Sequence, residues 1–471
     1  MNLFPGFDLM AASRWASVAP SIVAATYAPA PMVAQLARTR YDALVRHARA
    51  RSPFYAERLK HLPDRPRLED LPRVSRAELM ARFDQWVTDP DIRRSAIDDF
   101  IADPVRCGDA FLGRYAVWTS SGTSGVPGVY VSDPDALAVH DALLALRGPS
   151  LNGAAMLWQT LAGGGRLAMI AARDGHFAGI ASWERARRAH PWLQARCRSL
   201  SVTQPIDDLV TELNTWQPAL LASYPSVLSA LGESQESGRL HIRPSTLWCG
   251  GEELTAIERK RLEQVFGCSI HEEYAASECM NIAFSCQTGA LHLNADWVIL
   301  EPVDERGQPV PAGQPSAETL LTNLSNRVQP LIRYQLGDSI TMLAEPCSCG
   351  CPLPALRVEG RHDDVLQLPS AGGKPITIVP LAIESVIEDR AGVHQFQLEQ
   401  RPGNTLSIRL NAPPQRTPND AWRSVRRCLR EFLDAHGAHA TRIVFDPAAP
   451  IANRASGKLR RVHGIARPPT A

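Results

Sequence analysis

A run of hydroxyl residues and glycines from Thr119 to Gly128 is the segment of the chain best suited to bind an anion. It reads Thr-Ser-Ser-Gly-Thr-Ser-Gly-Val-Pro-Gly and follows the apolar segment 115–118. Glycine lets successive backbone N–H groups converge on a phosphate, and serine and threonine add neutral donors. The run differs from the Walker loop, because it has no lysine and Val126-Pro127 follows its second glycine. The pattern predicts a phosphate-binding loop, with a plain surface turn as the alternative.

Four segments further along the chain combine carboxylates, hydroxyls and basic groups in ways that suit nucleotide chemistry. They are Tyr274-Ala275-Ala276-Ser277-Glu278, Arg333-Tyr334-Gln335-Leu336-Gly337-Asp338, Gly360-Arg361-His362-Asp363-Asp364 and Ser456-Gly457-Lys458. Each has an ordinary alternative, because a loop glutamate or a lysine near a terminus is usually a solvated surface charge. An aspartate after glycine commonly caps a turn. Residue types alone therefore leave a nucleotide site and a solvated surface both open.

Taken in order, the five motifs resemble the core motifs of the adenylate-forming ligase superfamily, which contains acyl- and aryl-CoA synthetases, luciferases and peptide-synthetase adenylation domains. Three further segments resemble its phenylacetate-CoA ligase branch. They are the segment 45–59 with Ser52-Pro53-Phe54-Tyr55, the turn Tyr224-Pro225-Ser226 and the cysteine insertion Cys347-Ser348-Cys349-Gly350. The resemblance covers about residues 40 to 462.

The resemblance implies that the protein activates carboxylic acids. A carboxylate would attack the α-phosphorus of ATP to give acyl-AMP and pyrophosphate, and a thiol or an amine would then take the acyl group. The β- and γ-phosphates would lie in the first loop, on Ser121, Gly122, Thr123, Ser124 and Gly125. Many relatives carry a lysine in this loop, where the chain has Val126 and Gly128. We therefore expect the loop to bind pyrophosphate less strongly than in those relatives.

The resemblance also assigns roles to single residues of the other motifs. Tyr274 would stack on adenine, Ser277 would reach the α-phosphate, Asp338 would accept both ribose hydroxyls, and Arg361, Gly251 and Glu252 would complete the AMP site. Glu278 would hold Mg²⁺, since a hard cation prefers carboxylate oxygen. Lys458 would be the catalytic residue, because its charge would bridge the carboxylate and the α-phosphate. Asp363 would be the hinge of a mobile C-terminal domain.

A separate group of cysteines suits a metal ion. Cys347 and Cys349, with Cys351 two residues further on, are too closely spaced to be scattered core thiols, and a closed zinc site needs four ligands. Cys286 and His292 would supply the other two ligands. They lie in a turn-like segment after Glu278, where several relatives place comparable residues. Cys351 takes a position usually held by arginine, so it is not counted among the four zinc ligands. The prediction is a structural Zn²⁺ that ties a loop to the nucleotide site. The alternative is that these cysteines are free thiols in a loop.

The acyl substrate and the acyl acceptor are the least determined features. Trp158, Phe177, Tyr224 and Trp248 are aromatic candidates for the acyl pocket, and the branch favours an aryl or medium-sized hydrophobic acid. The acceptor is CoA in one hypothesis, and in a second it is the phosphopantetheine of an acyl carrier protein or an amine. The segment 370–374 could pass a pantetheine arm in either case. A third hypothesis is a degenerate nucleotide-binding protein that has lost turnover.

The composition excludes several classes of partner. The chain has 471 residues, of which 45% are hydrophobic, so it has the core-forming residues for two or three domains. With 50 basic and 49 acidic residues the net charge is +1, and no overall field draws the chain to nucleic acid or an anionic membrane. The absence of a long apolar run and of an export signal predicts a cytoplasmic protein without a membrane span. A homodimer stays an open alternative to a monomer.

Alternating short strands and helices indicate an α/β fold with a large layered N-terminal body. Strands are expected at 167–171, 219–222, 247–249 and 320–322, and helices at 32–60 and 256–266. Ligands in such sheets bind at the carboxyl ends of strands, where the loop 120–128, Gly250-Gly251-Glu252 and Tyr274 to Glu278 would converge.

The pattern changes after residue 361 to that of a small α+β domain. Strands are expected at 395–400 and 405–410 around the turn Arg401-Pro402-Gly403-Asn404, followed by an amphipathic helix and a strand at 441–445. The first 30 residues carry no clear period, which indicates a loosely docked arm. The expected organisation is an arm at 1–30, an adenylation domain at 31–361 and a mobile C-terminal domain at 362–471.

Overall fold

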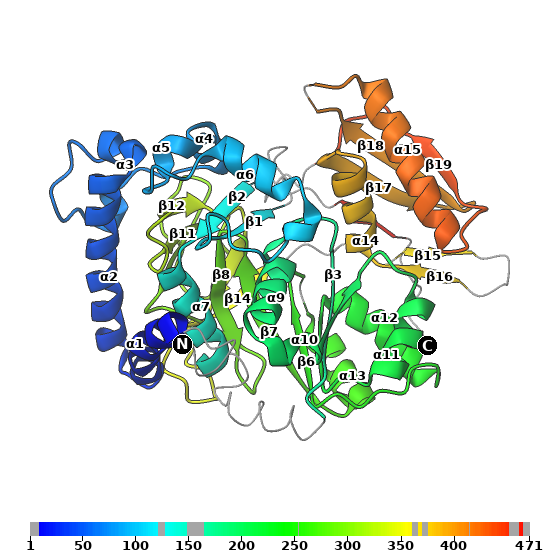
Figure 1. Cartoon of the computed structure of the whole chain (residues 1–471), viewed down its shortest axis with the longest axis horizontal. Helices are drawn as coiled ribbons and strands as arrows, with labels where there is room; N and C mark the ends of the chain where they lie inside the picture. Colours follow the sequence, from blue (N-terminus) through cyan, green and yellow to red (C-terminus); the bar gives the residue numbers. More distant parts are fainter. Residues whose placement is uncertain are drawn as a thin grey trace.

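A nine-stranded mixed sheet forms the centre of the molecule (Figure 1). The computed structural model describes residues 9–120, 128–147, 164–252, 254–359, 366–369, 375–413, 415–451 and 461–464. In sheet order the strands are β13 (Ser339–Met342), β14 (Ala355–Glu359), β9 (Leu291–Leu293), β8 (Cys279–Ser285), β7 (Ser269–Ala276), β6 (Thr246–Gly250), β5 (Leu220–Ser223), β3 (Leu167–Ala171) and β4 (Cys197–Ser201).

Half of this sheet is parallel and is built from alternating strands and helices. Strands β4, β3, β5, β6 and β7 are parallel, and the connections contain α9 (Ala178–Ala189), α10 (Pro191–Gln194), α11 (Ile206–Trp216), α12 (Pro225–Glu236) and α13 (Ala256–Phe266). Helix α13 begins where the Thr255 hydroxyl accepts from the Glu258 N–H at 3.2 Å and ends at Gly267, whose φ is +66°. The α/β class predicted from the alternation is confirmed.

Two smaller sheets flank the antiparallel half of the central sheet. One has β10 (Val298–Val303), β11 (Glu318–Asn323) and β12 (Leu331–Gln335) in that order. The other is the hairpin-like pair β1 (Ala116–Ser120) and β2 (Gly128–Ser132), which is followed by α7 (Pro134–Arg147). The predicted phosphate loop therefore follows a strand of a separate ribbon and not a strand of the main sheet.

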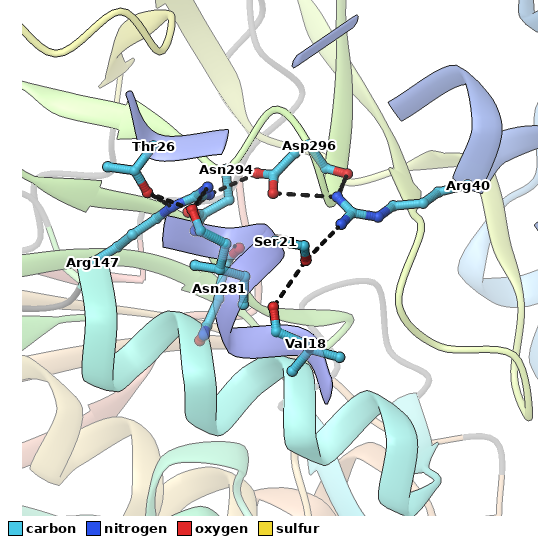
Figure 2. A network of polar contacts seen from close by, with 9 residues as sticks. Val18, Ser21, Thr26, Arg40, Arg147, Asn281, Asn294 and Asp296 are labelled. Atoms are coloured by element: carbon cyan, nitrogen blue, oxygen red, sulfur yellow. Dashed lines mark hydrogen bonds and ion pairs between the residues drawn. The ribbon is translucent and has the colours of Figure 1, made fainter. Parts of the chain in front are cut away.

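The N-terminal region is helical and docked, unlike the loose arm expected from the sequence. Helix α1 (Leu9–Thr26) has one charged residue, Arg14. It therefore lacks the alternation of polar and apolar faces by which a helix is recognised in a sequence. Its Ile22 is fully buried against α7. Figure 2 shows Arg147 of α7 and Arg40 reaching Asp296 from two sides, beside the last turn of α1.

The remaining N-terminal elements after α1 are one long helix and a series of short ones. They are α2 (Ala30–Arg51), α3 (Pro53–Arg58), a 3₁₀ turn (Leu68–Asp70), α4 (Arg76–Ala81), α5 (Phe83–Trp86), α6 (Arg94–Ile101) and a second 3₁₀ turn (Pro104–Arg106). None of the helices among the described residues is long and apolar enough to cross a membrane.

A four-stranded sheet covered by one long helix lies at one end of the molecule (Figure 1). Its order is β19 (Arg442–Phe445), β18 (Thr405–Asn411), β17 (Gln395–Arg401) and β20 (Val462–His463), and its helix is α15 (Pro418–Ala435). The predicted hairpin is confirmed, with Arg401 opposite Thr405. Strands β15 (Leu366–Leu368) and β16 (Ile376–Ile378), helix α14 (Pro380–Ser385) and a π-helical turn (Val386–Arg390) precede it. The domain boundary at 361/362 falls outside the described residues and stays a prediction.

Candidate active site and metal centre

The carboxyl ends of β6 and β7 bring two of the predicted motifs together. Gly250 at the end of β6 lies opposite Glu273 of β7, so Gly251 and the segment from Tyr274 onward emerge side by side. Gly251 has φ +82°, and a Cβ there would approach the Tyr224 ring to 3.2 Å. This position therefore requires glycine.

A hydrogen bond joins two residues that were predicted to hold the nucleoside. The Tyr274 hydroxyl donates to Asp338 Oδ2 at 2.9 Å, although the residues are 64 positions apart. Burial, followed by the charge of Asp338, raises the pKa of Tyr274 well above its ordinary value. The phenol therefore stays protonated and keeps donating to the carboxylate, which lies at the start of β13.

Ser277 is hydrogen-bonded to β1, the strand that precedes the predicted phosphate loop. The Trp118 indole N–H donates to the Ser277 carbonyl at 2.7 Å, and the Ser277 hydroxyl lies 3.4 Å from the Thr119 carbonyl. Thr119 N–H in turn donates to the His176 carbonyl at 2.7 Å, in the link between β3 and α9. These contacts place the end of β1 against the β7–β8 turn, as a shared phosphate site would require.

Glu278 is buried and surrounded by three donors. Its Oε1 accepts from the Tyr334 hydroxyl at 2.6 Å, from the Tyr130 hydroxyl at 2.8 Å and from the Arg76 guanidinium at 2.9 Å. Burial alone would lower the pKa of Arg76, but the charge of Glu278 outweighs it and the pKa is raised. Of these three donors only Tyr334 was predictable, because it lies in the Arg-Tyr-x-x-Gly-Asp motif, and no pattern marks Arg76 or Tyr130.

The contacts described for Glu278 are compatible with Mg²⁺. All three hydrogen bonds go to one carboxylate oxygen, and Glu278 also lines a small hollow together with Trp118. Mg²⁺ in nucleotide enzymes is commonly bound by one or two carboxylates plus substrate phosphates. A single glutamate beside a hollow therefore fits the ion, and the assignment stays a prediction.

Glu252 has contacts of a different kind. Its Oε2 accepts from the Ser226 backbone N–H and its Oε1 from the Ser226 hydroxyl, both at 2.9 Å. Ser226 lies in the first turn of α12, so this carboxylate satisfies donors at a helix N-terminus. Its predicted contact with AMP stays a prediction, and the observed contacts are structural.

Several predicted site residues lie outside the described residues. They are Ser121, Gly122, Thr123, Ser124, Gly125, Trp158, Arg361, Asp363 and Lys458. Their roles in binding, catalysis and hinge motion stay predictions that follow from the resemblance.

The four predicted zinc ligands come together. The ligand atoms of Cys286, His292, Cys347 and Cys349 all lie within 4.8 Å of one another. Cys286 Sγ and Cys347 Sγ are 3.8 Å apart, too far for a disulfide bond. Two sulfurs bound tetrahedrally at about 2.3 Å from Zn²⁺ are separated by about 3.8 Å, so the spacing suits a shared zinc ion.

The histidine of this cluster is oriented as a ligand. His292 Nδ1 lies 2.8 Å from the Leu353 carbonyl, which can only accept, so Nδ1 carries the proton. Nε2 is then free to bind a metal and lies 3.3 Å from Cys349 Sγ. Cys351 is not among the four residues; its backbone N–H donates to Cys349 Sγ at 3.3 Å, and its side chain contacts both His292 and an apolar cluster.

The position of the cluster differs from the expectation that it adjoins the nucleotide site. Glu278 precedes β8 and Cys286 follows it, so the two residues lie at opposite ends of this strand. Eight residues of extended chain at ~3.3 Å each separate them by ~26 Å. The cluster instead ties the loop between β13 and β14 to the far end of β8 and to β9.

Comparisons with known proteins give limited sequence identity and extensive structural likeness. No protein-family model matches the chain. Over 162 residues the chain is 26% identical to Protein CapK of Staphylococcus aureus, covering 34% of each protein. Over 186 residues it is 25% identical to phenylacetate-coenzyme A ligase of Thermus thermophilus, covering 37% of this chain and 40% of that protein. The matched region thus spans only 34% and 40% of the length of these curated relatives.

Solved structures of one enzyme match nearly the whole chain. A crystal structure of 2-hydroxyisobutyryl-CoA ligase with 2-HIB-AMP and CoA, in the thioesterification state, covers 94% of this chain and 91% of that one, with a TM-score of 0.58 and 18% identity. An open conformation of the same ligase with 2-HIB-AMP and CoA covers 94% and 93%, with a TM-score of 0.54 and 18% identity. The chain therefore has the fold of the adenylate-forming ligases, and its resemblance to that superfamily is confirmed.

Proposed function

We propose that the protein uses ATP to convert a carboxylic acid into acyl-AMP and pyrophosphate, and then transfers the acyl group to the thiol of CoA. The observation that supports this most is the Tyr274–Asp338 hydrogen bond. It holds an aromatic ring and a carboxylate together at the carboxyl edge of the sheet, where an adenine ring and two ribose hydroxyls need such partners.

The proposed chemistry requires neutralisation of charge on phosphate oxygens. A free carboxylate has no leaving group, and adenylation supplies one at the cost of charge that develops on the α-phosphate. Lys458 would bridge the substrate carboxylate and the α-phosphate, and the hydroxyls and N–H groups of 121–125 would hold the other phosphates. Mg²⁺ would be held by Glu278 and would supply Lewis-acid stabilisation of phosphate charge.

CoA is the acceptor that the comparisons support best. The ligase whose fold matches was solved with CoA, both in an open conformation and in the thioesterification state. Those two states also support a C-terminal domain that moves between the half-reactions. Transfer to a carrier-protein phosphopantetheine or to an amine is the alternative, and a degenerate nucleotide-binding protein is the alternative from another class. A cytoplasmic location and a homodimer stay predictions.

The cysteine–histidine cluster adds a structural zinc ion to this proposal. Three sulfurs and one imidazole nitrogen form a closed ligand set of the kind found in structural sites, with no position left for a substrate. The cluster lies at the far end of β8 from Glu278. Zinc would therefore fix the β13–β14 loop and take no part in the chemistry.

Carboxylate-dependent exchange of pyrophosphate into ATP tests the first half-reaction. We expect exchange that requires both a carboxylic acid and Mg²⁺, followed by acyl-CoA formation when CoA is added. The variant Lys458→Ala should lower exchange by about 10²-fold, the scale for one preorganised charge, while ATP binding measured by calorimetry changes little. Unchanged exchange in this variant would remove Lys458 from the mechanism. Absence of exchange with every acid of a broad panel would favour the degenerate protein.

A further inference from the structure

Arg76 brings a positive charge from outside the central sheet to the buried Glu278. It is the first residue of α4, which begins where the Ser75 hydroxyl accepts from the Glu78 N–H at 3.3 Å. Its Nε donates to the Tyr334 hydroxyl at 3.2 Å, and its Nη2 donates to Glu278 Oε1 at 2.9 Å. Two contacts thus fix the charge beside the carboxylate that is predicted to hold Mg²⁺.

Helix α4 packs against β2, the strand that follows the predicted phosphate loop. Val129 N and Met80 Sδ are 3.4 Å apart. The next residue of β2, Tyr130, donates from its hydroxyl to Glu278 Oε1 at 2.8 Å, so Tyr130 and Arg76 meet at the same oxygen. Arg76 therefore lies close to the first residues of β2, where the loop ends.

The predicted phosphate loop has no basic residue of its own. The run Thr119 to Gly128 offers only neutral hydroxyl and N–H donors. Gly128 has no room for a side chain, because a Cβ there would lie 2.6 Å from both Ser120 Oγ and the Tyr130 hydroxyl oxygen. A triphosphate bound in this loop therefore needs a cation from another element, and Arg76 is the cation that shares a partner with Tyr130.

The guanidinium of Arg76 suits this task by its geometry and its burial. A guanidinium carries five N–H donors in a planar fork, so one group can bind a carboxylate and a phosphate oxygen together. The side chain of Arg76 is 17% exposed and that of Glu278 is 4% exposed. Such limited access of water strengthens the attraction between the guanidinium and a phosphate.

We propose that Arg76 binds the β- and γ-phosphates of ATP and supplies the positive charge that the phosphate loop lacks. The inference rests on the ATP site of the proposed function and adds a residue to it. In adenylation a carboxylate oxygen forms a bond to the α-phosphorus, the bond from that phosphorus to the bridging oxygen breaks, and pyrophosphate leaves with the electron pair. The guanidinium stabilises the negative charge that gathers on this leaving group. Glu278 and Tyr334 hold the guanidinium in position.

Binding measurements test this role of Arg76 without turnover. Calorimetry measures the affinity for ATP, inorganic pyrophosphate and AMP, with Mg²⁺ and again in EDTA, so that the contribution of Arg76 is separated from that of the metal. AMP lacks the β- and γ-phosphates and reports whether a variant has damaged the nucleoside site. The variants are Arg76→Gln, which removes the charge, and Arg76→Lys, which keeps it. Arg58→Gln is the matched control, because it makes the same change at an arginine that pairs with Glu78 of α4.

We expect Arg76→Gln to lower the affinity for ATP and pyrophosphate by about tenfold or more, the scale of one charge-assisted hydrogen bond, and to leave the affinity for AMP unchanged. Arg76→Lys and Arg58→Gln should retain most of the affinity for ATP. Equal losses for ATP and AMP, or unchanged affinity for ATP in a folded Arg76→Gln, would show that Arg76 only supports Glu278. Either result would overturn the inference and leave the proposed function standing.

The wild type provides the test if Arg76→Gln fails to fold because Glu278 has lost its counter-charge. Modification by an arginine-specific dicarbonyl reagent is mapped by mass spectrometry, and pyrophosphate should protect Arg76 while AMP should not. Arg58, with 21% of its side chain exposed, is the comparison within the same protein and should react in every case. Reaction of Arg76 that pyrophosphate does not slow would overturn the inference. ATP binding that depends on Arg76, without pyrophosphate exchange for any acid, would overturn the proposed function alone.

Discussion

At the scale of single residues, the candidate nucleoside site depends on one buried contact between distant parts of the chain. Tyr274 follows Glu273 near the end of β7, and Asp338 is the last residue of the three-residue link between β12 and β13. Their hydrogen bond fixes the direction of the carboxylate before any ligand binds. A preorganised acceptor loses less freedom when ribose arrives, which is how a positioning contact contributes to affinity.

Removal of that contact should weaken nucleotide binding more than catalysis. Tyr274→Phe keeps the ring and deletes the donor, so Asp338 can rotate away from the ribose. A typical hydrogen bond contributes about 1 kcal/mol, so we expect the KM for ATP to rise by about fivefold with a smaller change in kcat. Steady-state pyrophosphate exchange at varied ATP measures both constants.

A matched control separates this effect from general destabilisation. Tyr115→Phe deletes another tyrosine–aspartate hydrogen bond, to Asp89, that lies outside the candidate site. Both variants should lower the free energy of unfolding by about 1 kcal/mol. Equal KM values for ATP in Tyr274→Phe and wild type would show that the contact is structural only.

At the scale of elements, regular segments and the zinc ligand set were predictable, and most other long-range contacts were not. The strand 167–171 and the helix 256–266 have the bounds that apolar runs and a capping threonine indicate. Helix α1 was missed because a nearly uncharged helix shows no period. Motif resemblance found Tyr274, Asp338 and Glu278. Arg76 contacts Glu278 across 202 residues, and no local pattern in a sequence encodes such a contact.

The cysteine–histidine cluster should hold zinc and stabilise the end of the sheet to which it is attached. Thiolate and imidazole ligands bind Zn²⁺ when the fold holds them together, so purified protein should carry about one equivalent of metal. The double variant Cys347→Ser and Cys349→Ser should lose the metal and melt at a lower temperature, and Cys286→Ser should behave similarly. Metal analysis with thermal unfolding measures both effects.

Cys351→Ser is the control for the zinc prediction, because Cys351 lies beside His292 but is not one of the four residues of the ligand set. It should retain zinc. Activity should fall less than stability in the ligand variants, since the cluster lies at the far end of β8 from Glu278. A wild type free of zinc after purification under reducing conditions would leave these residues as unpaired loop thiols.

The buried ion network of Figure 2 should hold α1 and α7 to the body of the protein. Asp296 and Arg147 are fully buried, with Asp296 Oδ1 2.6 Å from Arg147, and Arg40 lies 3.2 Å from Asp296 Oδ2. Asp296→Asn would leave buried guanidinium groups without a counter-charge. We expect a loss of about 3–5 kcal/mol in the free energy of unfolding, measured by urea denaturation.

An exposed ion pair provides the comparison for Asp296→Asn. Asp135 pairs with Arg14 of α1, and 82% of its side chain is exposed. Asp135→Asn makes the same chemical change in solvent and should cost no more than about 1 kcal/mol. Similar losses in the two variants would show that burial of the network contributes little to stability.

At the scale of the whole molecule, the segment that follows Lys458 is anchored in the four-stranded C-terminal sheet. Arg461 is fully buried and donates to Glu384 at 2.8 Å and to Glu388 at 2.6 Å. Its carbonyl accepts from the Leu398 N–H at 2.6 Å, where β20 joins β17. Residues 461–464 are thus bound to this sheet, so we expect any motion that brings Lys458 to ATP to carry the sheet with it.

The last prediction concerns that motion. If the C-terminal domain rotates about Asp363 between adenylation and acyl transfer, Asp363→Pro would fix φ near −65° and favour one of the two orientations. We expect the variant to retain one half-reaction and to be impaired in the other. Pyrophosphate exchange measures the first half-reaction, and transfer from preformed acyl-AMP to CoA measures the second. Val365→Pro, two residues further on, is the matched control for a proline in the same segment, because it leaves the backbone of Asp363 unrestricted. Equal loss of both half-reactions in Asp363→Pro, with an unchanged melting temperature, would argue against rotation at this residue, because a locked hinge must favour one orientation over the other.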